Sequence, residues 1–114
     1  MKHADLTFDT EFRVVAGNAR SQAAEMTLEP WQTEGGPDNR HKGADQWLFV
    51  MAGTGVAVVE GEQIALTAGT ILLIEQGEAH EIRNTGSLPL KTINVYLPPA
   101  YDEQGEELPA GKRT

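Results

Sequence analysis

The 114-residue sequence contains no cysteine and no apolar run as long as a membrane span. The absence of cysteine excludes a disulfide framework and is typical of a reducing compartment. The lack of a long apolar run argues against a membrane helix, and the polar first residues do not resemble a secretory signal. We therefore expect a cytoplasmic protein. Residues 1–114 are expected to form a single domain, because a chain of this length buries one core.

Basic residues are also few, since nine Lys and Arg stand against seventeen Asp and Glu, for a formal charge of −8. Such a charge repels phosphate backbones and anionic lipid surfaces. Nucleic acid and membranes are therefore not expected as partners. Several of the acids crowd the C-terminal tail, so the body of the protein is less acidic than the total suggests.

Short segments of β type, separated by glycine-containing turns, run through most of the chain. The expected strands are residues 6–15, 20–29, 46–52, 56–60, 63–66, 71–74, 80–84 and 88–97. Residues 31–45 are rich in Gly, Asp and Asn and predict a loop. About eight short strands whose edges need cover favour an all-β barrel or jelly roll. We expect its core over residues 6–99 and a partly ordered C-terminal arm over 100–114.

The stretch from Gly69 to Asn84 carries the most information about function. It predicts a β-hairpin, in which an apolar strand and a turn precede a second strand bearing His80, Ile82 and Asn84 at period two. These three side chains share one face of the strand. A polar, an apolar and another polar residue on one wall are unusual for a core, and they indicate a pocket.

Four fixed positions in this stretch resemble the second motif of the cupin superfamily, a group of small jelly-roll barrels. The family pattern is matched by Gly69, Gly77, His80 and Asn84, while Glu75 stands where the family has proline. Matching spacing within a strand–turn–strand context is fairly specific. The resemblance implies a double-stranded β-helix, the jelly-roll cupin barrel.

The first cupin motif is less complete, with His41, Gly43, Gln46 and Gly53 at its four positions. The resemblance implies a divalent metal held at the barrel mouth by three histidines and a glutamate. Here the implied ligands are His41, Gln46 and His80, and the ion would be Fe, Ni, Cu or Zn. A neutral glutamine is a weaker donor than carboxylate, so metal affinity should be lower.

Further pocket residues are expected around the implied metal site. Glu75, Asn84 and Tyr96 are candidate substrate-binding residues, although a turn residue such as Glu75 is more often simply solvated. Trp31 is expected to pack near the pocket mouth.

Three functions remain open at this point, because cupins perform many reactions and the fold does not select one. The first is a metal-dependent small-molecule enzyme of dioxygenase-like type. The second is a non-catalytic protein that binds a small metabolite. The third is a metal-free sugar isomerase or epimerase, with His41 or His80 as base and Tyr96 or Tyr101 as acid.

An aromatic stripe in residues 46–52 indicates an oligomer. If Gln46 faces the interior, Trp47, Phe49 and Met51 face outward and need cover. We expect a homodimer that buries this stripe. The alternative is cover by the chain's own N-terminal segment.

Overall fold

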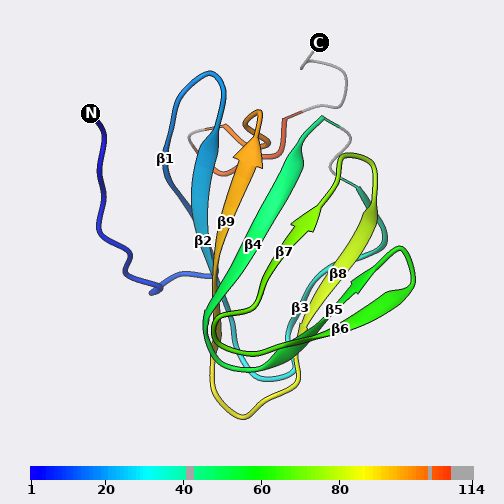
Figure 1. The fold of residues 1–114 in the computed structure, drawn as a ribbon. Coiled ribbons are helices and arrows are strands. Elements are labelled where there is room, and N and C mark those ends of the chain that lie inside the picture. Colours follow the sequence, from blue (N-terminus) through cyan, green and yellow to red (C-terminus); the bar gives the residue numbers. More distant parts are fainter. Residues whose placement is uncertain (41–42, 103, 109–114) are drawn as a thin grey trace.

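A computed structural model describes residues 1–40, 43–102 and 104–108, and in these ranges the chain forms nine strands arranged in two antiparallel sheets (Figure 1). One sheet has the strand order β1-β2-β9-β4-β7 and the other has the order β3-β8-β5-β6. The strands are β1 (Phe12–Gly17), β2 (Gln22–Leu28), β3 (Thr33–Arg40), β4 (Asp45–Ala52), β5 (Gly55–Val59), β6 (Glu62–Leu66), β7 (Ile71–Ile74), β8 (Ala79–Asn84) and β9 (Leu90–Leu97). This confirms the all-β jelly-roll fold expected from the sequence.

Helices are absent from the described ranges, and accordingly none there is long and apolar enough to cross a bilayer. The first strand also begins later than expected, at Phe12 instead of residue 6. The residues before β1 run along the outside of β1 and β2 (Figure 1).

The prediction of a loop over residues 31–45 was wrong, because β3 occupies most of that segment. Thr33 pairs with Arg83 and Glu34 pairs with Ile82 on the neighbouring strand β8. The register then shifts between Gly35 and Arg40. A strand at the edge of a sheet tolerates Gly, Pro and Asp, because its partner strand supplies the pairing. The composition of this segment therefore did not indicate a strand.

The predicted hairpin over residues 69–84 was also wrong in its pairing. β7 pairs with β4 in one sheet, whereas β8 pairs with β3 and β5 in the other. The turn between them carries the chain from sheet to sheet, and the Glu78 N–H closes it by donating to the Glu75 carbonyl over 3.0 Å. Gly77 has φ +87° there, which explains the glycine. Period-two alternation cannot distinguish a hairpin from a crossing between facing sheets.

The inner face of β4 follows the predicted alternation. Gln46, Leu48 and Val50 are buried, whereas Trp47 and Met51 are exposed. The apolar core between the sheets consists of Met26, Leu28, Leu48, Val50, Ala57, Leu66, Ile82 and Leu90. Along β9 the inward positions change from Leu90 to polar side chains and then Tyr96, so one end of the interior is polar.

Candidate functional site

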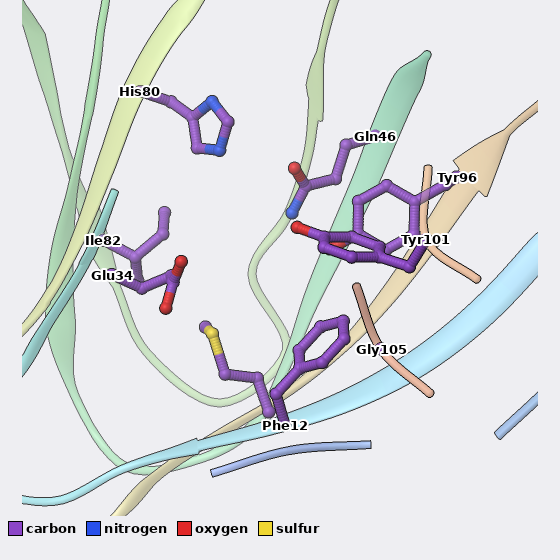
Figure 2. Close-up of a pocket in the computed structure, with 9 residues that line it drawn as sticks. Phe12, Glu34, Gln46, His80, Ile82, Tyr96, Tyr101 and Gly105 are labelled. Carbon is purple, nitrogen blue, oxygen red and sulfur yellow. The ribbon is translucent and has the colours of Figure 1, made fainter. Parts of the chain in front are cut away.

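A cavity of about 210 Å³ lies at this polar end of the sandwich (Figure 2). The sheet that contains β4 and β9 contributes Gln46 and Tyr96, which are paired across the two strands. The facing sheet contributes His80 from β8 and Glu34 from β3. The complete lining is Phe12, Met26, Glu34, Gln46, His80, Ile82, Tyr96, Tyr101 and Gly105.

Gln46 is the polar residue of the cavity whose bonding is incomplete. Its side chain is only 4% exposed, and its Nε2 donates to Asn94 Oδ1 over 3.3 Å. Its Oε1 is buried without a hydrogen-bond partner among the described residues. An unsatisfied buried acceptor costs about 1–3 kcal/mol. A donor that enters the cavity would remove this cost.

Two tyrosines and a phenylalanine form an aromatic wall. The ring centroids of Tyr96 and Tyr101 are 5.1 Å apart, and those of Phe12 and Tyr101 are 4.7 Å apart. Burial, followed by the neighbouring Tyr101, raises the pKa of the Tyr96 phenol well above its usual range. Burial likewise raises the pKa of Tyr101 to about 12, although its hydrogen bond with Tyr96 acts in the opposite direction. Both phenols are therefore neutral at physiological pH.

The charge around the cavity is negative. Glu34 lies on an exposed part of β3 and reaches toward the cavity (Figure 2). Partial burial, and then the charges of Glu11 and Glu107, raise the pKa of its carboxyl group. Glu34 and Glu107 also contribute to the raised pKa values of both tyrosines. Among the described lining residues there is no Lys or Arg to offset these carboxylates.

Three of the residues proposed from the sequence meet at this cavity. Gln46, His80 and Tyr96 all line it, with the His80 ring facing the Gln46 amide from the opposite sheet (Figure 2). His80 is 3% exposed, and its Nδ1 lies 3.5 Å from the Glu78 carbonyl oxygen. His41, the other implied ligand, lies outside the described residues.

Two further candidates are placed elsewhere. Glu75 lies in the exposed turn before β8, where its backbone N–H donates to a carboxylate oxygen of Glu78 over 2.7 Å, and it does not line the cavity. Trp31 is 78% exposed and is also absent from the cavity wall, contrary to expectation.

Asn84, the last residue of the cupin motif, has a structural role in this chain. Its Nδ2 donates to the carbonyls of Leu28 and Leu88 over 2.8 and 2.9 Å. Its Oδ1 accepts from the Gly86 N–H over 2.8 Å. The side chain is 1% exposed, lies outside the cavity lining and ties the end of β8 to two neighbouring segments. The structure therefore gives no support to the expected contact with substrate.

Glu34 was not predicted from the sequence as a site residue, and Tyr101 was named only as a possible acid of the isomerase or epimerase alternative, yet both line the cavity. Glu34 lay in the segment interpreted as a loop, and Tyr101 lay in the expected arm. In the described part of that arm, Leu108 N–H donates to the Ala100 carbonyl over 2.8 Å, which folds the segment back on itself. Gln22 anchors it, with Nε2 donating to the Tyr101 carbonyl over 2.7 Å. An isolated tyrosine in a tail otherwise poor in apolar residues was the available signal.

The donors that the structure describes do not make a metal site by themselves. No group of three or more His, Asp or Glu side chains suited to a metal ion occurs among the described residues. Gln46 Oε1 and the His80 imidazole are two neutral donors, and the carboxylate of Glu34 lines the same cavity. A transition ion generally needs three or four ligands, including some negative charge.

Known proteins support the fold assignment. An oxalate-binding protein of Thermotoga maritima is 30% identical over 74 residues, which cover 65% of this chain and 60% of that protein. The chain thus spans less than two thirds of the length of that relative.

Solved structures show the same fold. A protein of Thermus thermophilus superposes with a TM-score of 0.74 at 23% identity, covering 86% of this chain and 98% of the other. A predicted oxalate decarboxylase from Thermotoga maritima gives a TM-score of 0.69 at 25% identity, covering 77% and 79%. The cupin domain family model matches residues 24–96, which include most of both sheets and the Gln46, His80 and Tyr96 positions. The chain therefore belongs to the cupin family.

Proposed function

We infer that this cupin binds a small molecule in the cavity between its sheets, with a donor group of the ligand facing Gln46 Oε1. The observation that carries this inference is the buried Oε1, which has no partner among the described residues. Apolar walls from Met26 and Ile82 suit a ligand that is only partly polar. Binding without catalysis is the function that these features favour.

The isomerase or epimerase alternative receives less support from the cavity. Such chemistry needs an acid and a base whose pKa values lie near the working pH. The pKa of Tyr101 is raised to about 12 and that of Tyr96 is raised well above its usual value. These phenols can donate hydrogen bonds to a ligand, but they are poor proton donors in a reaction near neutrality.

The oxalate named for the Thermotoga maritima relative does not suit this cavity by itself. A dianion would meet the Glu34 carboxylate, and the described lining residues include no Lys or Arg to bind it. Oxalate would need a bridging cation. We therefore expect the metal-free protein to bind oxalate weakly.

Binding through Gln46 can be tested by titrating the protein with butyramide, whose N–H groups can donate to Oε1, and following backbone amide resonances by NMR. We expect shifts concentrated in β4 and β9. Gln46→Met should weaken the affinity roughly tenfold, because a buried hydrogen bond is lost. The matched control is Gln63→Met on exposed β6, which should bind as the wild type does. Equal binding by all three proteins would contradict the proposal.

A metal-dependent enzyme of dioxygenase-like type is the second candidate. Gln46 Oε1 and His80 line the same cavity, and His41 is the further ligand implied by the family resemblance. A bound Fe, Ni, Cu or Zn ion would supply Lewis-acid or redox chemistry. Elemental analysis of untagged protein tests this candidate. Stoichiometric metal that is lost in His80→Ala, retained in the control His3→Ala and held more tightly in Gln46→Glu would support it. Protein that stays empty after incubation with each ion would contradict it.

The outer face of β4 and β7 supports the proposed homodimer. Trp47 lies opposite Leu73, and Phe49 lies opposite Ile71. Trp47 is 42% exposed and Ile71 is 59% exposed. The N-terminal segment does not cover them, because the backbone N–H groups of residues 7 and 8 are bound to Glu25 on β2 instead.

Sedimentation velocity tests this dimer. Wild-type protein should sediment as a dimer, and Leu73→Glu should sediment as a monomer, because a charge would be buried in the interface. Ile64→Glu is the matched control, since Ile64 is similarly exposed at 41% but lies on β6 of the other sheet. A monomeric wild type, or equal behaviour of the two variants, would contradict the proposal.

A further inference from the structure

The inference concerns the chemical class of the ligand and rests on the proposed binding cavity. We propose that this cavity recognises a small organic cation, a primary ammonium that donates an N–H to Gln46 Oε1 while its charge is balanced by the carboxylate of Glu34. The apolar part of the ligand would lie against Met26 and Ile82.

The carboxylates around the cavity favour a positively charged ligand. Glu34 lines the cavity, and Glu11 and Glu107 lie near enough for their charges to raise the pKa of its carboxyl group. A nearby positive charge would relieve this repulsion, whereas a ligand carboxylate would increase it. Acidic residues alone are common on protein surfaces and do not by themselves make a binding site.

A buried hydrogen-bond acceptor on the opposite wall provides an independent reason to expect a cationic ligand. Gln46 is only 4% exposed, and its Nε2 is held by Asn94, so Oε1 is the atom left for a ligand. An ammonium group has donors and no acceptor, which matches this position. A carboxylate ligand has only acceptors when ionised and would leave Oε1 unsatisfied. Charge and hydrogen bonding thus select the same class of ligand.

The aromatic wall is consistent with this selection. Phe12, Tyr96 and Tyr101 border the cavity as one cluster of rings. The face of an aromatic ring attracts a cation, and the attraction increases when the cation is desolvated. Two arginines directly follow lining residues in the sequence, but both form ion pairs. Arg13, next to Phe12, pairs with Glu25, and Arg83, next to Ile82, pairs with Glu81. The described lining itself contains no Lys or Arg, and His80 is the lining residue there that can carry a positive charge.

The test compares three probes of nearly equal size at pH 7, namely n-butylammonium, 1-butanol and butyrate, each titrated by NMR at constant ionic strength. We expect n-butylammonium to bind about tenfold more tightly than butyrate, with 1-butanol between them. Equal affinities, or tighter binding of the alcohol or the acid, would overturn the cation preference while leaving the small-molecule cavity in place. Absence of binding by all three probes and by butyramide would overturn the proposed function as well.

Variants assign the preference to specific groups. Glu34→Gln should weaken butylammonium binding about two- to fivefold and leave 1-butanol unchanged, as expected for an ion pair at an exposed rim. Glu62→Gln makes the same change of charge on exposed β6 and should leave both affinities unchanged. Equal weakening by the two variants would show that only the net charge attracts the cation, and it would overturn the role of Glu34. An unchanged affinity in Glu34→Gln would do the same.

Discussion

Asn94 orients the amide of Gln46 across the paired strands β9 and β4. Gln46 Nε2 donates to Asn94 Oδ1, and Asn94 Nδ2 in turn donates to Thr92 Oγ1, both over 3.3 Å. All three side chains are buried, with exposures of 4%, 1% and 0%. Because each amide is held by its neighbour, the Gln46 oxygen is the group presented to the cavity. This row of buried polar side chains thereby leaves Gln46 Oε1 as a hydrogen-bond acceptor for a ligand.

Replacement of Asn94 by leucine tests this arrangement. Asn94→Leu leaves Gln46 Nε2 without its acceptor and should lower the free energy of unfolding by about 1–3 kcal/mol. Urea denaturation measures this loss. The double variant Asn94→Leu/Gln46→Leu removes both polar groups and should recover part of it. Full additivity of the two single substitutions would show that the side chains are not coupled.

Asn84 should affect stability without affecting ligand preference. Asn84→Ala removes three hydrogen bonds, to the Leu28 and Leu88 carbonyls and from the Gly86 N–H. We expect a loss of about 2–4 kcal/mol, because each of these groups is left without its partner. Thermal denaturation measures the loss, and the relative affinities for butyramide and butyrate should match those of the wild type. A change in that ratio would indicate that Asn84 contacts the ligand after all.

The tyrosine titration provides a direct check of the cavity. The chain has two tyrosines, Tyr96 and Tyr101, and burial raises both pKa values, that of Tyr101 to about 12. Absorbance at the tyrosinate band should therefore change little near pH ~10, where exposed tyrosines titrate. The stability that the neutral phenols contribute is fully present below the unfolded pKa and is lost as pH rises through the folded values.

Denatured protein is the control for this titration and should titrate near pH ~10. A native protein that shows half of its tyrosinate absorbance at that pH would contradict the buried position of Tyr101.

Glu25 should make the fold sensitive to acid. It is fully buried at 0% exposure and accepts from Arg13 Nε over 3.2 Å and from the Thr7 N–H over 3.0 Å. Burial by itself raises the pKa of this carboxyl group, but the Arg13 bond and the backbone donors of Thr7 and Phe8 outweigh it and the pKa is lowered. The resulting stability is present above the unfolded value of about 4.3 and is lost as pH falls through the folded pKa.

Urea unfolding at neutral and acidic pH measures this dependence. Glu25→Gln should be destabilised by about 2–4 kcal/mol at pH 7 and should lose less stability than the wild type on acidification, because the titrating group is gone. Glu29→Gln, at an exposed position next to β2, is the control and should keep the wild-type acid response. An identical acid response in Glu25→Gln would contradict the assignment.

Much of the fold was predictable from local pattern. Alternation predicted that Trp47 and Met51 face outward if Gln46 faces inward, and the structure has this arrangement. The motif spacing correctly indicated the cupin family. Both succeed because the direction of a strand residue and the position of a turn depend on near neighbours in the chain.

Which side chains face Gln46 and His80 across the cavity was decided only by the tertiary structure. Glu34 entered the cavity because β3 pairs with β8, and Tyr101 entered it because the segment after β9 folds back onto Gln22. Asn84 fits the family motif, yet its hydrogen bonds all go to protein backbone.

The sequence by itself determined which side chains point inward and which family the chain resembles, because side-chain alternation and turn chemistry are local properties. The tertiary structure decided which of those side chains face one another. That outcome depends on long-range strand pairing, and period-two patterns fit many pairings equally well. The unsatisfied oxygen of Gln46 therefore became visible only when β4, β9 and the facing sheet were brought together.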